Sequence, residues 1–297
     1  MAEELKALDE PGRPTLHVAS ASDGYRWHYR RYPPPGRPVA RVVFLHGIQS
    51  HGGWYPRSCS QIAAAGYEVF FLERRGCGLN TENRGDFPSF RRCLDDIAEF
   101  VRDLPTDKPR LMGAISWGGK LGVGFQYRHP GLVDGLALLC PGFFPKVRPG
   151  FLQRLWIGRC ALRAPTKLFP IPLNDPALFT ESEQWREFLR KDPLALHHAT
   201  ARMLFQSNSL DIYLRRAKRW VKIPTILMLA EHDRIIDNAK TRRYVDKFPG
   251  AKQVIEYPGA HHTLEFEPEG HPFVRDLLGW LRTSREVCLS AKMDVGG

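Results

Sequence analysis

Short, almost wholly apolar runs alternate with longer amphipathic stretches along most of this 297-residue chain. A strand without regular polar positions is buried on both faces, which is typical of a parallel sheet. The amphipathic stretches have helical spacing, and strands that alternate with helices build a sheet covered on both faces. The apolar runs lie at 42–47, 67–73, 111–116, 133–140, 225–233 and 253–259, and the helical stretches at 59–66, 90–104, 117–129, 239–248 and 272–287.

Two runs of alternating polarity precede this pattern, at residues 16–20 and 25–32, and a Ser-Asp-Gly turn separates them. Such a pair predicts an antiparallel hairpin. With the six later runs it gives eight strands, so we expect an α/β protein with a mostly parallel eight-stranded sheet. After about Cys288 no pattern continues, and residues 289–297 are expected to form a frayed tail.

One long interruption separates the sixth strand from the seventh. Between Pro141 and about Ile223 no strand pattern is found, and residues 181–191 and 197–207 have helical spacing. A loop of this length is uncommon inside a compact domain. We therefore expect a helical cap, inserted after the sixth strand. The predicted division is 1–142 for the first part of the core, 143–222 for the cap and 223–297 for the second part of the core.

The cap carries most of the positive charge. Residues 141–220 contain 14 Lys and Arg against six Asp and Glu, and the whole chain has a net charge of +11. A basic segment can contact an anionic membrane, an acidic substrate or nucleic acid, or it can simply be a solvated helical surface. Nucleic acid is disfavoured because these residues follow no recognition motif.

Composition excludes several other classes of protein. The N-terminal residues MAEELKALDEPGRP are acidic and lack the regions of a secretory signal. No run approaches the roughly 18 apolar residues of a membrane-spanning helix. Six scattered cysteines include no C-x-x-C pair, which favours free thiols in a reducing compartment and no zinc site. We expect a cytoplasmic protein with peripheral membrane contact through the basic cap.

Ser116 lies where an apolar run meets a helical stretch, in the sequence LMGAISWGGK. A nucleophile on a sharp strand-to-helix turn needs small residues two positions before and after it, so that the two backbones approach closely. Ala114 and Gly118 occupy these positions. The alternative is a serine that only caps the following helix.

The stretch FLHGIQSHGGWY, residues 44–55, follows an early strand and supplies a second part of a site. After His46 and Gly47 the chain can turn sharply, so that the N–H of Ile48 points into a pocket. With the N–H of Trp117 it would form an oxyanion hole. The alternative is an ordinary loop, and His46 itself is expected to be structural.

The stretch LAEHDRIID, residues 229–237, supplies candidate carboxylates at the end of a late strand. Asp233 follows the apolar run directly and could orient a histidine. Asp237 is expected to cap the helix that begins near Ala239, and Glu231 is the weaker rival for the acid.

The stretch YPGAHHTLEFEP, residues 257–268, follows the last strand and contains two adjacent histidines. A loop at this edge can deliver a base to a serine. Periodicity does not choose between His261 and His262. The order of serine, aspartate and histidine along the chain is that of α/β-hydrolases.

Taken together, these motifs resemble those of α/β-hydrolases of the monoacylglycerol lipase and lysophospholipase family, which is related to the S33-type serine hydrolases. That family's H-G-x-x-x-H-x-x-x-Y motif is matched by His46, Gly47, His51 and Tyr55. Its G-x-x-H-x-L-x-x-E loop is matched by Gly259, His262, Leu264 and Glu267. The resemblance therefore implies that His262 is the base and that Asp233, in EHDRIID, is the acid.

The chain departs from the family at one turn. The H-G-x-G-x-S turn is matched only by Gly76 and Gly78, and Asn80 stands in place of the serine. This turn is structural. The resemblance covers about residues 25–285 and is weakest in the cap.

The resemblance implies the α/β-hydrolase fold and a two-step acyl transfer that needs no metal or organic cofactor. The expected substrate is a long-chain monoester, either a monoacylglycerol or a lysophospholipid whose phosphate lies near the basic cap. Apolar stretches of the cap, which either line an acyl channel or pack on the core, lie at 143–147, 151–158, 168–172 and 202–205. Two alternatives are an amidase of the proline iminopeptidase type, which needs acidic groups for a substrate amine, and a catalytically silent binding protein.

Overall fold

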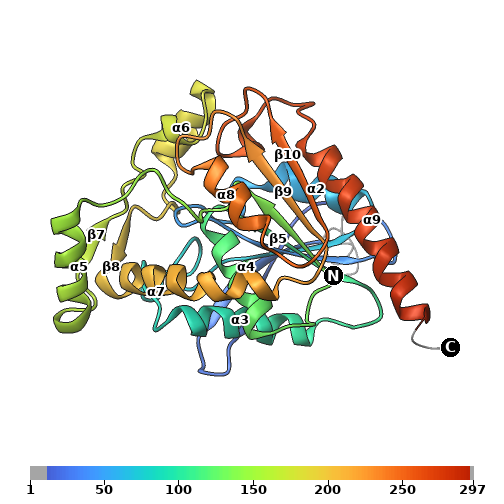
Figure 1. The fold of residues 1–297 in the computed structure, drawn as a ribbon, viewed down its shortest axis with the longest axis horizontal. Coiled ribbons are helices and arrows are strands. Elements are labelled where there is room, and N and C mark those ends of the chain that lie inside the picture. Colours follow the sequence, from blue (N-terminus) through green and yellow to red (C-terminus); the bar gives the residue numbers. More distant parts are fainter. Residues whose placement is uncertain (1–11, 295–297) are drawn as a thin grey trace, which may run out of the picture.

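An eight-stranded sheet runs through the centre of the computed structural model, which describes residues 12–294 (Figure 1). Strand β2 pairs antiparallel with β1 and β4, and all other neighbours in the sheet are parallel. The order is β1 (Thr15–Ser20), β2 (Arg26–Tyr32), β4 (Glu68–Leu72), β3 (Arg41–Leu45), β5 (Arg110–Ile115), β6 (Gly135–Leu139), β9 (Thr225–Ala230) and β10 (Lys252–Tyr257). The predicted mostly parallel sheet with an N-terminal hairpin is confirmed.

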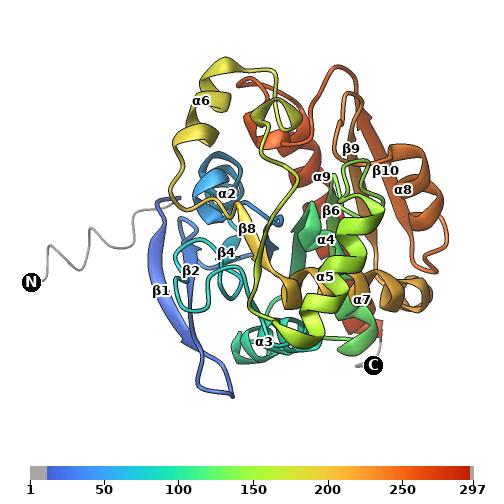
Figure 2. The same ribbon diagram turned by 90° about the vertical axis from the view of Figure 1, so that its left-hand side faces the viewer.

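Helices cover both faces of this sheet, as the apolar strands require (Figures 1 and 2). Helices α2 and α9 pack together on one face, while α3, α4 and α8 cover the other. Their bounds are α2 (Pro56–Ala64), α3 (Phe90–Asp103), α4 (Trp117–Arg128), α8 (Asn238–Val245) and α9 (Phe273–Asp294). None of the helices among residues 12–294 combines the length and apolar character needed to cross a bilayer.

The C-terminal tail differs from the prediction. Helix α9 continues beyond Cys288 to Asp294, whereas the sequence pattern predicted a frayed end there. The Cys288 thiol donates to the carbonyl of Asp134 at 3.6 Å, so this part of the helix is tied to the loop before β6. Residues 295–297 lie outside the described part of the chain.

The segment between β6 and β9 is largely helical, as expected. It contains α5 (Phe151–Arg163), η2 (Pro176–Leu178), α6 (Glu183–Lys191), α7 (Ala201–Ala217) and η3 (Lys218–Trp220). It also contains two strands that the sequence did not predict, β7 (Leu168–Pro170) and β8 (His198–Thr200), which pair antiparallel. Three residues are too few for a period of two to be recognised. We propose that residues 143–222 form a cap on a core made of 1–142 and 223–297.

Helix α5 projects from one end of the molecule (Figure 1). Its buried residues Ile157 and Cys160 form a small cluster with Phe169 and Ala201. The opposite face is exposed and apolar: the exposed fractions are 71% for Phe151, 79% for Leu152, 57% for Leu155, 46% for Trp156 and 82% for Leu162. The stretch 151–158 therefore presents most of its large apolar side chains to solvent. Neither of the roles expected for it, lining an acyl channel or packing on the core, accounts for this exposed face.

The turn after β4 forms in spite of its departure from the family pattern. Gly76 and Gly78 have φ values of 62° and 55°, a region that side chains disfavour. The Asn80 amide donates to the carbonyls of Glu73 at 2.9 Å and Arg74 at 3.1 Å, and its oxygen accepts from the N–H of His28 at 2.9 Å. Asn80 thus satisfies three backbone groups at this turn.

Replacing Asn80 with alanine is expected to destabilise the protein by about 1–3 kcal/mol, because buried backbone groups lose their partners. Urea unfolding followed by tryptophan fluorescence measures the change. Thr81→Ala, at an exposed position of the same turn, is the control and is expected to have a smaller effect. Equal unfolding midpoints for wild type and Asn80→Ala would contradict the structural role of Asn80.

Candidate active site

Ser116 occupies a strained turn between β5 and α4. Its φ and ψ are 50° and −121°, which few residues with a side chain adopt. The turn is held by its own backbone: the N–H donates to Leu139, and the carbonyl accepts from Gly119 and Gly142. The Ser116 side chain makes no capping hydrogen bond to α4, so the geometry does not match the alternative of a helix cap.

Small residues around Ser116 allow this turn. A Cβ atom at Gly118 would lie 2.5 Å from the carbonyl oxygen of Leu45, so the start of α4 touches the end of β3. A Cβ atom at Gly122 would lie 3.0 Å from the Cβ of Ala114. Both positions of the A-x-S-x-G pattern therefore lie at close contacts between helix and sheet.

His262 lies between Ser116 and Asp233. Its Nε2 lies 2.9 Å from Ser116 Oγ, and its Nδ1 lies 2.7 Å from Asp233 Oδ2. The Asp233 side chain is buried, and its other oxygen accepts from the N–H groups of Ile235 and Ile236 at 2.8 and 2.9 Å. Because the ionised carboxylate only accepts, Nδ1–H donates to it, and Nε2 is left to accept the Ser116 proton.

The neighbouring candidates have other partners. The ring of His261 lies 3.2 Å from Glu267 Oε1 and 3.3 Å from Glu181 Oε1. Asp237 caps α8 by accepting from the N–H of Lys240, and Glu231 accepts from the N–H of Gly259. Among the candidates for base and acid, the structure brings only His262 and Asp233 to Ser116.

The loop after β3 passes beside Ser116. A Cβ atom at Gly47 would lie 3.2 Å from the Ser116 Cβ, so the backbone approaches the hydroxyl closely. The N–H groups of Ile48 and Trp117 have no acceptor among residues 12–294. These are the two donors that the sequence predicted for an oxyanion hole.

His46 holds this loop. Its Nδ1–H donates to the carbonyl of Gly47 at 2.7 Å, and its Nε2 accepts from the N–H of Arg74 at 2.9 Å. Burial and the nearby Arg74 charge hold the pKa of His46 well below its ordinary value. The ring is therefore neutral and has both nitrogens occupied, which agrees with the expected structural role.

His51 connects the same loop to the predicted cap. Its Nε2 lies 2.9 Å from Asp192 Oδ2, which also accepts from the indole N–H of Trp54 at 2.6 Å. Burial alone would raise the pKa of Asp192, but the hydrogen bonds from His51 and Trp54 lower it. Asp192 follows α6, so an ionised carboxylate fixes the end of α6 over the loop.

Several residues around the site were not predicted. Phe179 lies edge-on to His262 with ring centroids 6.1 Å apart, and its carbonyl accepts from the N–H of Thr263. The indole N–H of Trp117 donates to Ser207 on α7 at 2.8 Å. Asp192 lies 141 positions from its partner His51 in the sequence. No local pattern marks contacts between residues so far apart in sequence.

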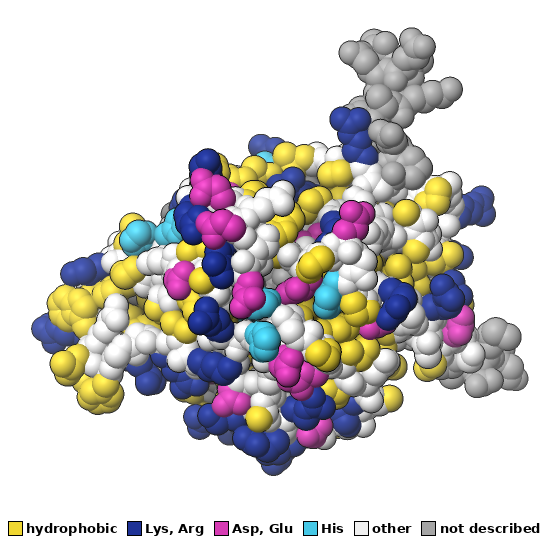
Figure 3. Space-filling view, turned by 90° about the horizontal axis from the view of Figure 1, so that it is seen from above, with side chains coloured by type: hydrophobic (Ala, Val, Ile, Leu, Met, Phe, Trp, Pro, Cys, Tyr) yellow, Lys and Arg dark blue, Asp and Glu magenta, His cyan; other side chains and the backbone are white. Residues whose placement is uncertain are grey.

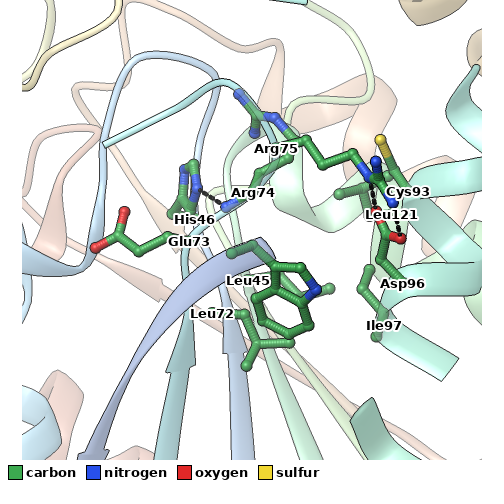
Figure 4. Close-up of a pocket in the computed structure, with 11 residues that line it drawn as sticks. Leu45, His46, Leu72, Glu73, Arg74, Arg75, Cys93, Asp96, Ile97 and Leu121 are labelled. Atoms are coloured by element: carbon green, nitrogen blue, oxygen red, sulfur yellow. Dashed lines mark hydrogen bonds and ion pairs between the residues drawn. The ribbon is translucent and has the colours of Figure 1, made fainter. Parts of the chain in front are cut away.

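A cavity of about 30 Å³ lies beside the loop, between the ends of β3 and β4 and helix α3 (Figure 4). Its lining includes Trp27, His46 and Arg74 but not Ser116. It has room for about one or two water molecules. It is too small for an organic substrate.

One group of side chains in the described part of the chain could offer ligand atoms to a metal ion. Cys140, Asp233 and His262 place such atoms within 4.8 Å of one another. However, Asp233 and His262 are bonded to each other, and His262 faces the Ser116 hydroxyl. The ligand atoms of Asp233 and His262 therefore already have protein partners.

A serine hydroxyl, an imidazole and a buried carboxylate at the carboxyl edge of this sheet define a serine hydrolase of the α/β-hydrolase fold. The sequence profile of the Hydrolase_4 family, described as serine aminopeptidase, S33, matches residues 36–269. The chain belongs to this family.

Relatives with assigned names are distant. The chain is 29% identical to a monoacylglycerol lipase of Mycolicibacterium smegmatis over 42% of its own length and 46% of that protein. It is 22% identical to human monoglyceride lipase, over 75% of this chain and 74% of that one. It spans only 12% of an uncharacterised abhydrolase-domain protein of Dictyostelium discoideum, with 31% identity over 37% of this chain.

Among solved structures, a soluble variant of the monoglyceride lipase of Saccharomyces cerevisiae, in complex with a substrate analogue, has a TM-score of 0.81. It is 20% identical in sequence, and the match covers 92% of this chain and 96% of that one. This similarity shows the α/β-hydrolase fold.

Glu265, in the loop that carries His262, is a buried carboxyl. One oxygen accepts from the N–H of Ser58 at 3.0 Å, and the other has no partner among the described residues. Burial raises the pKa of Glu265 from its ordinary value of 4.5 to about 7.

The folded protein therefore retains this proton up to about pH 7, while the unfolded chain releases it near pH 4.5. Stability should fall as the pH rises through this window. Glu265→Gln does not lose stability in this way, because glutamine does not ionise. The free energy of unfolding of Glu265→Gln, relative to that of wild type, is therefore expected to be about 2–3 kcal/mol higher at pH 8 than at pH 5. Urea unfolding at both pH values measures the difference. A difference that does not depend on pH would show that Glu265 is ionised in the folded protein.

Proposed function

We propose that this chain is a serine carboxylic-ester hydrolase that acts on a long-chain monoester lipid. The observation that carries the proposal is the hydrogen-bonded relay from Ser116 through His262 to the buried Asp233. Ser116 is the proposed nucleophile, His262 the general base and acid, and Asp233 the carboxylate that orients the ring and stabilises its charged form.

In the first step, Ser116 Oγ attacks the ester carbonyl carbon while His262 Nε2 takes its proton. The carbonyl oxygen becomes an oxyanion, which the N–H groups of Ile48 and Trp117 stabilise by hydrogen bonds. The tetrahedral intermediate then collapses, His262 gives its proton to the departing alcohol, and an acyl-serine remains. Loss of one oxyanion donor would cost about 2.7–4 kcal/mol of transition-state stabilisation.

In the second step, His262 takes a proton from water, and the resulting hydroxide attacks the acyl carbon. The second tetrahedral intermediate uses the same two N–H donors. It expels Ser116, which takes back the proton from His262, and releases the fatty acid. Asp233 remains ionised throughout.

The proposed substrate is a monoacylglycerol or a lysophospholipid. Relatives named monoglyceride lipase and lysophospholipase support an ester of this class. The bases Arg190 and Lys191 on α6 already pair with Glu183 and Glu187, which favours a neutral glyceryl head group over a phosphate. The excess of basic residues in the cap then has another proposed role, which is contact with a membrane through helix α5.

Helix α5 is the proposed surface for an anionic membrane. Its exposed apolar face is visible at one end of the molecule, with Lys and Arg side chains around it (Figure 3). The neighbouring bases Arg154, Arg159, Arg163 and Lys167 form no ion pairs within residues 12–294. An apolar helix face with flanking cations is typical of interfacial binding.

A panel of esters tests the proposed function. Wild type is expected to hydrolyse p-nitrophenyl decanoate faster than the acetate, and monoacylglycerol faster than a lysophospholipid. Ser116→Ala and His262→Ala should lower kcat by about 1,000-fold or more, because each removes one member of the relay. His261→Ala is the matched control for His262→Ala and should retain most activity.

Labelling with a fluorophosphonate separates the alternatives. An adduct on Ser116 is expected, and its absence would favour a catalytically silent binding protein. Faster turnover of prolyl-p-nitroanilide than of any ester would favour the amidase. Equal or faster turnover of acetate than of decanoate would contradict a long-chain substrate.

Vesicle co-sedimentation tests the membrane surface. Replacing Leu152 and Leu155 with serine should weaken binding to vesicles that contain phosphatidylglycerol by about tenfold, because two exposed apolar side chains are lost. The control exchanges Val287 and Leu289, which are exposed on α9, for serine and should bind as wild type does. Unchanged binding of the α5 variant would exclude this helix as the membrane contact.

A further inference from the structure

The guanidinium group of Arg74 lies at the carbonyl oxygens of the loop that carries Ile48. Its Nη1 donates to the carbonyl of Gly47 at 3.1 Å, and its Nη2 donates to the carbonyl of Ile48 at 3.0 Å. The side chain is buried, and its position beside His46 is seen in Figure 4. One planar fork thus fixes two consecutive peptide groups.

The first of these peptide groups contains the proposed oxyanion donor. The Gly47 carbonyl and the Ile48 N–H belong to one planar trans peptide, so they point in opposite directions. The carbonyl receives two donors, His46 Nδ1–H at 2.7 Å and Arg74 Nη1 at 3.1 Å. Donors on the carbonyl side set the direction of the N–H, and they also draw electron density from the nitrogen. A cationic donor does this more strongly than a neutral one.

The second proposed donor belongs to Trp117, which the same guanidinium contacts. Arg74 Cζ lies 4.5 Å from the centroid of the Trp117 ring, within cation–π distance. The indole N–H of Trp117 also donates to Ser207 Oγ at 2.8 Å. Arg74 therefore contacts the residues that supply both donors.

No carboxylate in the described part of the chain pairs with the guanidinium of Arg74. The adjacent Arg75 pairs with Asp96 and Asp23, at 2.5 and 2.7 Å. Within residues 12–294, Arg74 has no such ion pair, and its other partner is the Cys77 sulfur at 2.8 Å. A buried charge that faces backbone carbonyls, a thiol and an aromatic ring acts on those groups with little screening.

We propose that Arg74 is a positioning residue for the oxyanion hole, which orients and polarises the Ile48 N–H and fixes Trp117. The inference rests on the proposed function of Ser116. Arg74 does not touch the substrate and acts through the two N–H groups. Its contribution is therefore greatest where negative charge develops on the carbonyl oxygen.

Arg74→Met tests this proposal because it keeps the length of the side chain but removes the fork and the charge. We expect kcat to fall about 10- to 100-fold and KM to change less than threefold, since only the transition state carries the oxyanion. Affinity for a trifluoromethyl ketone, which forms a tetrahedral adduct with serine, should fall by a similar factor. Affinity for an unreactive ether analogue of the substrate should not change.

Arg84→Met is the matched control. Arg84 also donates to three backbone carbonyls, those of Gly78, Leu194 and Ala195, but within the described residues it donates no hydrogen bond to the loop after β3. It should not change the ratio of ketone to ether affinity. Arg74→Lys, which keeps the charge without the fork, should lie between wild type and Arg74→Met, and guanidinium ion should partly restore kcat in Arg74→Ala.

The proposal is overturned if Arg74→Met or Arg74→Lys, with a melting transition like that of wild type, retains kcat and the ratio of ketone to ether affinity. It is also overturned if Arg84→Met loses that ratio equally. If Arg74→Met fails to fold, Arg74→Lys and the guanidinium rescue decide the matter. Failure of the fluorophosphonate to label wild type would instead reject the function of Ser116.

Discussion

The strained backbone of Ser116 is the constraint on which the rest of the structure depends. A φ of 50° at a residue with a side chain costs of order 1–3 kcal/mol, so the surrounding structure must hold it. The contact of α4 with the end of β3 does this, and it is possible only because position 118 has no side chain. The same contact places the N-terminus of α4 and the loop after β3 on either side of one hydroxyl.

The carboxyl edge of the sheet brings the remaining groups to that hydroxyl. Parallel strands end at one edge, so the loops after β9 and β10 emerge at the same edge of the sheet as the turn after β5. Asp233 is fixed by two backbone N–H groups, and His262 is fixed by Asp233. Each side chain in the relay is thus oriented by the next, and the last is oriented by the backbone.

The proposed cap is bound to the core through buried polar contacts near the site. Asp192 accepts from His51 and Trp54, and Asp86 pairs with Arg202 and accepts from Thr200. These contacts tie the proposed cap to the core, while α5 packs on α7 at one end of the molecule (Figure 1). The apolar groups of the cap therefore divide between those that bury next to the core and those on α5 that face solvent.

The sequence by itself determined the alternation of strands and helices and the order along the chain of the strands that carry the site. It also determined the stretches that contain Ser116, Asp233 and the histidines. These features follow from hydrophobic periodicity and from the spacing of small residues, which act over a few neighbours. The short pairing of β7 with β8 and the extension of α9 to Asp294 were missed, because pairing and anchoring depend on distant partners.

Periodicity alone did not choose between the two adjacent histidines, and the family resemblance implied His262. Only the tertiary structure shows the contact itself, in which His262 Nε2 faces Ser116 Oγ across 146 positions of sequence. It also decided that Arg74 would bind the Gly47 and Ile48 carbonyls rather than a carboxylate, and that one face of α5 would stay exposed. The physical reason is the same in each case. Orientation and burial are set by the distances between side chains after the sheet has formed, and no local pattern contains those distances.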